Sequence, residues 1–177
     1  GSGILSQVPA AMQFIDAARL VPDSIAIPAF TEAVQAADGI VILDGVPRSV
    51  EQYMAMRKLI SDDNFLMLGI ELPEEELLIR AASRVVCGVC HAPGTMNGNM
   101  PNHCGVPMRP RGDDGSIADR IRDYHSKTKP AVMQAIQDGV GIMLDATQGS
   151  ANVVTQVVQI IQDRTSVQDR TSLEAIA

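Results

Sequence analysis

Aromatic residues are scarce in this sequence: they make up 3% of its 177 residues, and tryptophan is absent. Isoleucine, leucine, valine and the nine methionines must therefore fill most of the core. No apolar run approaches the ~20 residues of a membrane-spanning helix. The apolar segment 4–11 is short and has no basic flank, so it does not resemble a signal peptide. We expect a cytoplasmic protein without a membrane partner.

Positive charge is also in short supply, and the formal net charge is −7 at pH 7. An acidic protein repels the phosphate backbone of nucleic acids and the surface of anionic membranes, so neither is an expected partner. Any anion-binding site must be formed by a local group of basic residues. The length suffices for one domain that carries small inserted lobes.

Disulfides are not expected, because the chain has only three cysteines and two of them form the pair Cys87-x-x-Cys90. This spacing allows both thiolates to bind one Zn²⁺, and Cys104 supplies a third ligand. His103 and His91 are the candidates for the fourth ligand. The surrounding segment is rich in glycine and proline and cannot bury a core of its own, so a cross-link is expected there. The alternative is three unliganded thiols in a loop.

Short apolar runs alternate with helical patterns along the rest of the chain. Residues 40–43, 65–70 and 141–144 predict buried strands, and this alternation predicts an α/β fold with a parallel sheet. Helices are expected at residues 4–19, 24–36, 49–60, 73–84, 117–137 and 150–162, with Pro130 kinking or dividing the fifth. The tail from residue 163 repeats Asp-Arg-Thr-Ser and is predicted to be loose or held by a partner.

Three polar residues, Asp44, Arg48 and Gln52, follow the first predicted strand. Ligands bind at the carboxyl ends of strands in open α/β sheets. A guanidinium suits a phosphate, and an amide can read the edge of a base. The alternative is a turn between strand and helix, whose polar residues only cap and solvate it.

Arginines are placed at element ends and in the inserted segment of an otherwise acidic chain. Phosphoryl transfer needs such an array, because charge spreads over the oxygens of the transferred group. Taken singly, each arginine is also compatible with a solvated surface position. No G-x-x-x-x-G-K-[ST] phosphate loop occurs in the sequence. The arginines concerned are Arg48, Arg80, Arg84, Arg111 and Arg120.

The segment Asp44-Gly45-Val46-Pro47-Arg48-Ser49-x-x-Gln52 resembles the adenylate kinase family and departs from its pattern only at Val46. Further motifs follow in the order of that family, over about residues 4–162. They are Leu20-Val21-Pro22-Asp23 of the monophosphate site, Pro73–Leu77 before the lid, Cys87-x-x-Cys90 with Cys104-Gly105 of a zinc-bearing lid, Arg111-x-Asp113-Asp114 at the lid exit, Arg120-x-x-x-Tyr124, Thr128-x-Pro130 and Asp145-Ala146-Thr147.

The resemblance implies a P-loop-kinase-like parallel sheet flanked by helices, with a small inserted zinc-binding lid. It divides the chain into a shortened monophosphate-binding lobe (1–37), core (38–86), lid (87–114), core (115–162) and polar tail (163–177). Mg²⁺ with ATP and a structural Zn²⁺ would be the cofactors, and ATP, AMP and ADP the ligands. The protein would act as a monomer, or with a partner chain that completes the sheet.

The resemblance also implies roles for single residues. Arg48 would hold the acceptor monophosphate, Gln52 its adenine, and Asp44 the water shell of Mg²⁺. Arg80 would lie against the donor adenine. The catalytic residues would be Arg84, Arg111, Arg120 and Asp44; the nucleotide-binding residues Val21, Gly45, Arg48, Gln52, Arg80, Asp113 and Asp114; and the metal ligands Cys87, Cys90, Cys104 and His103.

Three departures from the family pattern separate the functional hypotheses. The first strand and the phosphate loop, expected before residue 4, are missing from this sequence. Ser6 replaces an arginine, and Pro101 stands where a third zinc ligand is expected, so His103 or His91 must substitute. The first hypothesis is a kinase that converts ATP and AMP to two ADP. The second is an inactive nucleotide-binding or structural relative, and the third a zinc-binding interaction module formed by residues 84–114.

Overall fold

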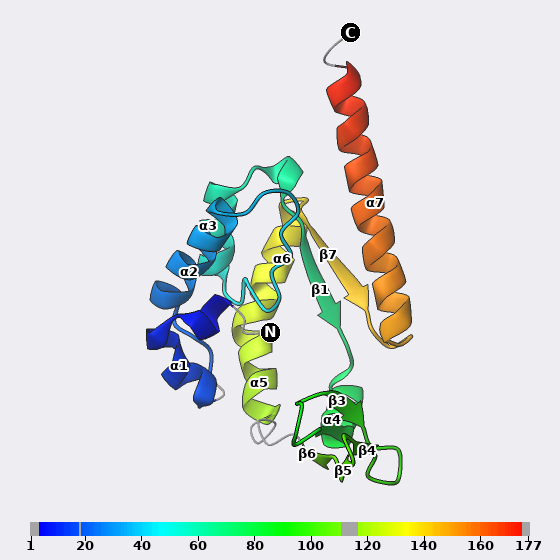
Figure 1. Ribbon diagram of the computed structural model, residues 1–177. Helices are drawn as coiled ribbons and strands as arrows, with labels where there is room; N and C mark the ends of the chain where they lie inside the picture. The colour runs from blue at the N-terminus through cyan, green and yellow to red at the C-terminus, as the bar shows by residue number, and fades with distance from the viewer. Residues whose placement is uncertain (1–3, 18, 111–116, 175–177) are drawn as a thin grey trace.

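The protein is a mixed α/β structure in which helices flank a parallel sheet (Figure 1). The computed structural model describes residues 4–17, 19–110 and 117–174. Strand β1 (Met67–Glu71) pairs in parallel with β7 (Gly141–Asp145), from Met67 opposite Gly141 to Glu71 opposite Asp145. Both runs are apolar, as is typical of strands buried by helices on either side.

Helices α3 (Val50–Leu59) and α6 (Lys129–Gln137) pack on one face of this sheet, and α7 (Ser150–Glu174) packs on the other. Gly69 allows α6 to approach β1 closely, because a Cβ there would lie 2.6 Å from Cγ1 of Val132. The main core joins the two strands to the helices through Phe30, Tyr53, Met56, Phe65, Met67, Ala131, Val132, Ala135 and Val140.

The prediction of a strand at residues 40–43 is wrong, since these residues pair with no strand in the described part of the chain. Leu43 packs against the main core, whereas Ile40 and Ile42 are 73% and 81% exposed. A strand requires hydrogen bonds from a neighbour, and apolar residues alone do not supply them. The main sheet therefore has two strands rather than the three expected.

The helices predicted at 24–36, 49–60 and 73–84 lie close to their predicted positions, whereas the helix predicted at 4–19 is divided into a 3-10 turn, residues 4–7, and a shorter helix, residues 9–16. Ser49 caps α3, where its Oγ accepts a hydrogen bond of 3.1 Å from the backbone N–H of Gln52. Glu74, Glu75 and Glu76 occupy the first turn of their helix, where the dipole favours acids. The elements are η1 (Ile4–Gln7), α1 (Pro9–Asp16), α2 (Asp23–Gln35), α3, η2 (Asp62–Asn64) and α4 (Glu74–Ser83).

The helix predicted at 117–137 is divided, as expected from Pro130. It consists of α5 (Ile117–Asp123), the π-helical turn η4 (Tyr124–Thr128) and α6. Proline lacks an N–H group and clashes with the carbonyl four residues earlier, so a wider turn precedes it. The result is that α5 and α6 follow one another along one side of the molecule (Figure 1).

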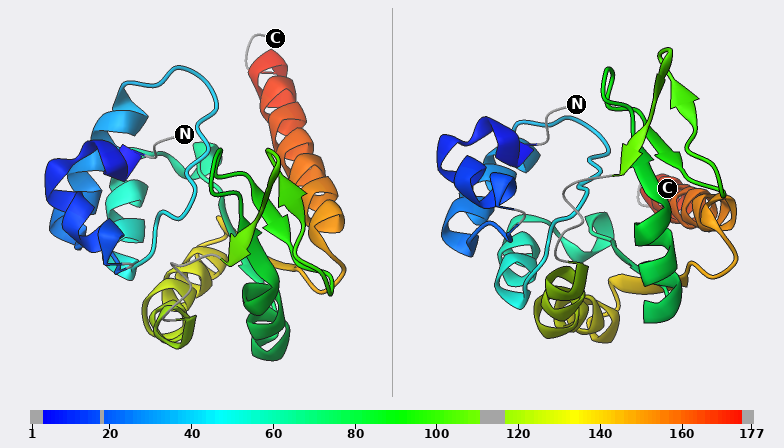
Figure 2. Two further views of the ribbon diagram at one scale, coloured as in Figure 1. Left: turned by 60° about the horizontal axis from the view of Figure 1, so that its bottom comes forward. Right: turned by 90° about the horizontal axis from the view of Figure 1, so that it is seen from below.

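A small lobe, residues 84–110, projects from the end of α4 (Figure 2). Its three-stranded antiparallel sheet has the order β3 (Pro93–Thr95), β2 (Arg84–Val86), β6 (Arg109–Pro110). The strands β4 (Asn102–His103) and β5 (Val106–Pro107) form a separate hairpin. The lobe buries only Val85, Cys87 and Met108 as its own core.

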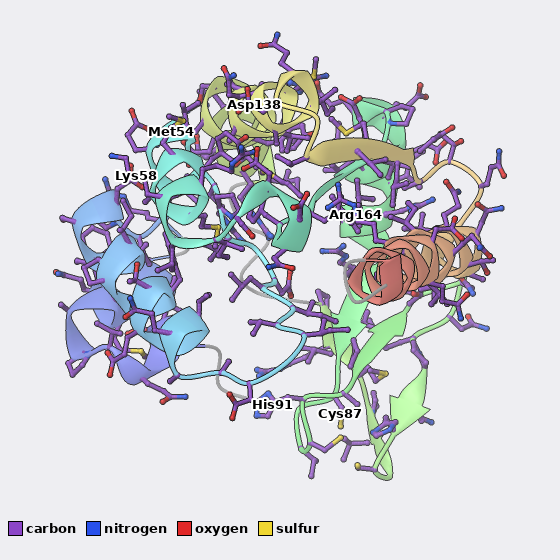
Figure 3. The ribbon with its side chains drawn as sticks, turned by 90° about the horizontal axis from the view of Figure 1, so that it is seen from above. Met54, Lys58, Cys87, His91, Asp138 and Arg164 are labelled. Carbon is purple, nitrogen blue, oxygen red and sulfur yellow. The ribbon has the colours of Figure 1, made fainter. Side chains whose placement is uncertain are left out.

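The closing helix is longer than predicted, because α7 continues through the Asp-Arg-Thr-Ser repeat to Glu174. Arg164 fastens it to the body, donating a 2.6 Å hydrogen bond from Nη1 to the carbonyl oxygen of Phe65 (Figure 3). Within the described ranges, no helix has the length and hydropathy required to cross a membrane.

Candidate functional site

The turn that contains Asp44 and Gly45 positions the side chain of Arg48. Gly45 adopts a φ of 73°, and a Cβ there would lie 2.6 Å from Nη2 of Arg48. The Nε group of Arg48 donates a 2.6 Å hydrogen bond to the carbonyl oxygen of Gly45. Glycine is therefore needed both for the backbone conformation and for the space that the guanidinium occupies.

A second arginine from a distant segment lies within electrostatic range of the first. Partial burial of the guanidinium and the charge of Arg120 on α5 lower the pKa of Arg48, while Asp44 acts in the opposite direction. Two guanidinium groups that repel each other are stabilised by an anion placed between them. The pair Arg48 and Arg120 is therefore suited to a phosphate, which guanidinium groups bind in forked geometry.

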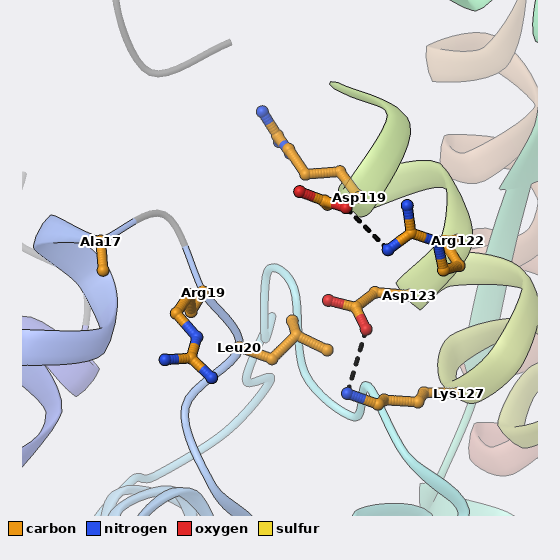
Figure 4. Close-up of a pocket in the computed structure, with 8 residues that line it drawn as sticks. Ala17, Arg19, Leu20, Asp119, Arg122, Asp123 and Lys127 are labelled. Atoms are coloured by element: carbon orange, nitrogen blue, oxygen red, sulfur yellow. Dashed lines mark ion pairs between the residues drawn. The ribbon is translucent and has the colours of Figure 1, made fainter. Parts of the chain in front are cut away.

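A polar cavity of about 470 Å³ lies between the segment that joins α1 to α2 and helix α5 (Figure 4). Two of its cations are paired: Arg122 with Asp119 at 2.7 Å, and Lys127 with Asp123 at 3.0 Å. Of the residues that line it, Leu20 and Arg120 belong to motifs singled out from the sequence, and the others were not predicted as site residues. The lining residues are Ala17, Arg19, Leu20, Asp119, Arg120, Arg122, Asp123 and Lys127.

Gln52 is held from two sides and is only 4% exposed. Its Oε1 accepts a 2.8 Å hydrogen bond from the backbone N–H of Arg48, and its Nε2 donates one of 2.7 Å to Oδ1 of Asp23. The hydroxyl of Ser49 donates to the same carboxylate oxygen at 3.0 Å. The structure thus brings together the motif at 20–23 and the motif at 44–52, which belong to different helices.

The predicted donor-side residues meet at the end of β7. Arg80, in the last turn of α4, donates from Nη2 to the carbonyl oxygen of Ala146 at 3.1 Å, and its guanidinium lies 3.6 Å from Glu76. The backbone N–H of Thr147 lowers the pKa of Asp145 through a 2.8 Å hydrogen bond. Arg80 therefore contacts the turn 145–147 that follows β7.

The remaining predicted residues are separated from these contacts or are not described. Asp44 is exposed beside Arg48, and Val21 is half-buried before α2. Arg84 begins β2 and is exposed at the base of the small lobe. Arg111, Asp113 and Asp114 lie outside the described residues.

Four side chains of the small lobe converge on one point. The donor atoms of Cys87, Cys90, His103 and Cys104 all lie within 4.8 Å of one another. The Sγ atoms of Cys90 and Cys104 are 3.5 Å apart, and Nδ1 of His103 is 3.3 Å and 3.2 Å from them. His91, the other candidate ligand, is not part of this group.

These distances fit a tetrahedral ion, because Zn–S bonds of about 2.3 Å place two sulfurs roughly 3.8 Å apart. The local backbone supports the arrangement. Cys104 and Gly105 adopt φ values of 51° and 76°, which turn the chain so that Cys104 can face His103. The neighbouring residues His103 and Cys104 can therefore point to a common centre, although adjacency made this geometry hard to expect from the sequence.

The thiols differ in their proton affinity. Backbone N–H groups of Cys90 and Val89 lower the pKa of Cys87 to about 6. The neighbouring thiol of Cys90, together with burial, raises the pKa of Cys104 to about 11. Several thiolates cannot be charged side by side without a cation, so the group as a whole is suited to a soft divalent metal.

Comparison with known proteins places these features in a family. A scan against models of protein families finds no match. The chain is similar to the adenylate kinase of Halobacterium salinarum, with 31% identity over 161 residues that cover 86% of this chain and 73% of the relative. It is also similar to the adenylate kinases of Carboxydothermus hydrogenoformans (29% identity; 86% and 77% covered) and Staphylococcus aureus Mu50 (29%; 85% and 76%).

An α/β structure with a parallel sheet flanked by helices is consistent with the fold of the P-loop kinases, the class of nucleotide-binding proteins to which these relatives belong. The chain belongs to the adenylate kinase family. Its motifs at 44–52 and 20–23, which suggested this family from the sequence, lie in contact in the structure.

Proposed function

We propose that this chain is a nucleoside monophosphate kinase that transfers a phosphoryl group from ATP to AMP and yields two ADP. The observation that carries the proposal is the pair Arg48 and Arg120, which come from separate segments and lie close enough for the charge of Arg120 to lower the pKa of Arg48. Arg48 would bind the acceptor phosphate, with Asp44 beside it to orient the water shell of Mg²⁺. The relatives named adenylate kinase support a kinase function for the chain.

The acceptor base would lie against Gln52 and the half-buried Val21. The donor adenine would lie against Arg80 and the turn that follows β7, where Arg80 already contacts Ala146. Arg84, Arg111 and Arg120 would surround the transferred phosphates, and Asp113 and Asp114 would belong to the wall of the site. Placing guanidinium groups around the moving phosphoryl group stabilises the charge that develops there.

The small lobe would act as a lid whose fold depends on Zn²⁺. Cys87, Cys90, His103 and Cys104 would hold the ion, and the metal would supply the cross-link that a core of three buried residues does not. On this proposal residues 1–37 form the monophosphate lobe and residues 87–114 the lid. Residues 38–86 and 115–162 form the core between them.

Formation of ADP from ATP and AMP, followed by a coupled assay, tests the proposal. The reaction also needs a phosphate loop, which residues 1–177 do not contain. The assay is therefore run with this chain and with the chain extended by a strand–loop–helix segment. Turnover by either form supports the kinase, whereas inactivity of both under saturating Mg²⁺ favours the second candidate, an inactive nucleotide-binding relative.

A further inference from the structure

The amide of Gln52 has a fixed orientation, because its two ends contact groups of opposite hydrogen-bonding character. The backbone N–H of Arg48 can only donate, and it meets Oε1 at 2.8 Å. The carboxylate of Asp23 can only accept, and it meets Nε2 at 2.7 Å. A flipped amide would set oxygen against carboxylate and NH₂ against N–H, so both contacts would become repulsive.

Asp23 is itself held in place. The hydroxyl of Ser49 donates to Oδ1 of Asp23 at 3.0 Å, and the same hydroxyl accepts the N–H of Gln52 at 3.1 Å. Asp23 opens α2 and Ser49 caps α3, so the carboxylate joins the two helices at their starts. Gln52 is 4% exposed, and its amide therefore cannot escape the contact by turning into solvent.

The fixed amide keeps one further N–H on Nε2 and one further lone pair on Oε1, since a primary amide carries two of each. A purine with a 6-amino group presents a donor there and an acceptor at N1, which match these two groups. A 6-oxo purine presents a carbonyl acceptor at position 6 and a donor at N1–H. The acceptor would face the lone pair of Oε1 and the donor would face the N–H of Nε2, so neither hydrogen bond could form. A freely rotating amide could serve either base by turning over.

We propose that Asp23 is a positioning residue that locks the Gln52 amide and so sets a preference for 6-amino over 6-oxo purine monophosphates. This inference rests on the proposed function, because it takes Gln52 as the group that meets the acceptor base. Asp23 acts through Gln52 and touches no substrate itself.

Calorimetric titration of the full chain with AMP and with IMP tests the lock. The two ligands share phosphate and ribose and differ only at the base edge, so their affinity ratio is insensitive to general loosening of the site. We expect the unaltered chain to favour AMP. In Asp23→Ala the preference should fall by about tenfold, the size of one hydrogen bond to a charged group.

Asp23→Asn is the matched variant, because it removes the same charge from the start of α2 but keeps an acceptor oxygen. It should restore most of the preference for AMP. An unchanged AMP-to-IMP ratio in Asp23→Ala, or equal binding of both ligands by the unaltered chain, overturns the lock alone. Failure of the unaltered, folded chain to bind AMP overturns the proposed function and the lock with it.

Discussion

Arg48 is the residue on which the account of the acceptor site depends most. Its backbone N–H fixes Gln52, and its guanidinium lies over Gly45 within electrostatic range of Arg120. The sequence motif identified Arg48 and Gln52 as site residues. It could not identify Asp23 as the partner of Gln52, because the two are 29 positions apart and meet only when α2 packs against α3.

Replacement of Arg48 by alanine should weaken AMP binding on the order of 100-fold, because charged hydrogen bonds to phosphate are lost. Affinity for ATP should change far less, since Arg48 is assigned to the acceptor. Lys58→Ala is the control: it removes an exposed positive charge from the last turn of α3, the helix that follows Arg48. Calorimetry measures the affinities of both variants for AMP and ATP. Equal losses of affinity for AMP and ATP in Arg48→Ala would contradict the assignment of Arg48 to the acceptor.

A buried tyrosine supplies a second prediction at this scale. The hydroxyl of Tyr53 donates to Asp138 at 2.5 Å and accepts from Arg57 at 3.2 Å, and its side chain is fully buried. Tyr53→Phe leaves both partners short of a bond and should lower the free energy of unfolding by about 1–3 kcal/mol. Urea denaturation measures this change.

Tyr124→Phe is the matched control, because the Tyr124 hydroxyl is buried without a hydrogen-bond partner in the described part of the chain. Its removal should cost little stability. If the two variants lose the same free energy of unfolding, the hydrogen bond between Tyr53 and Asp138 does not stabilise the fold.

At the scale of elements, periodicity predicted the helices well and the strands less well. Helices α2, α3 and α4 lie within a residue or two of the predicted ranges. Residues 40–43 have the composition of a strand but pair with no described neighbour, and a partner cannot be read from the segment itself. The helical conformation of the polar repeat after residue 162 was likewise not indicated by an apolar face.

The small lobe permits a direct test of its ligands. The purified chain should carry about one equivalent of zinc, and His103→Ala should lower that content strongly because one of four ligands is lost. His91→Ala should leave it unchanged. Metal analysis of both variants decides between the two histidines, and loss of zinc in His91→Ala alone would refute the assigned ligand set.

Zinc binding should also weaken as the pH falls. The ligands must lose their protons before they bind the metal, and Cys104, whose pKa is raised to about 11, holds its proton more strongly than Cys87, whose pKa is lowered to about 6. Competition with a chromogenic chelator at pH 8 and pH 6 measures the change. An affinity that does not fall on acidification would exclude the thiols as ligands.

At the scale of the whole molecule, the two halves of the proposed site are held by different parts of the fold. Contacts between α2 and α3 hold the residues proposed for the acceptor side, and the turn after β7 contacts Arg80 of α4, which is proposed for the donor side. The close approach of α6 to β1 at Gly69 belongs to the main core, which also includes Phe30 of α2 and Tyr53 of α3. The alternation of apolar runs with helical patterns predicted an α/β protein, and the two-sided site that the family resemblance implies stays a prediction.

Gly69→Ala tests this junction. The added methyl group would lie 2.6 Å from Val132 and 2.7 Å from Sδ of Met143, so we expect a loss of about 1–3 kcal/mol in the free energy of unfolding. Gly88→Ala, whose methyl group would meet nothing closer than 4.0 Å, serves as control. Equal stability of the two variants in urea would show that α6 and β1 separate at little cost.

Titration of the folded, zinc-loaded chain with AMP tests the central claim most directly. The account predicts one AMP bound per chain, with affinity reduced on the order of 100-fold in Arg48→Ala, as lost charged contacts to phosphate require. Absence of AMP binding by the folded chain, or binding that Arg48→Ala leaves unchanged, would contradict it.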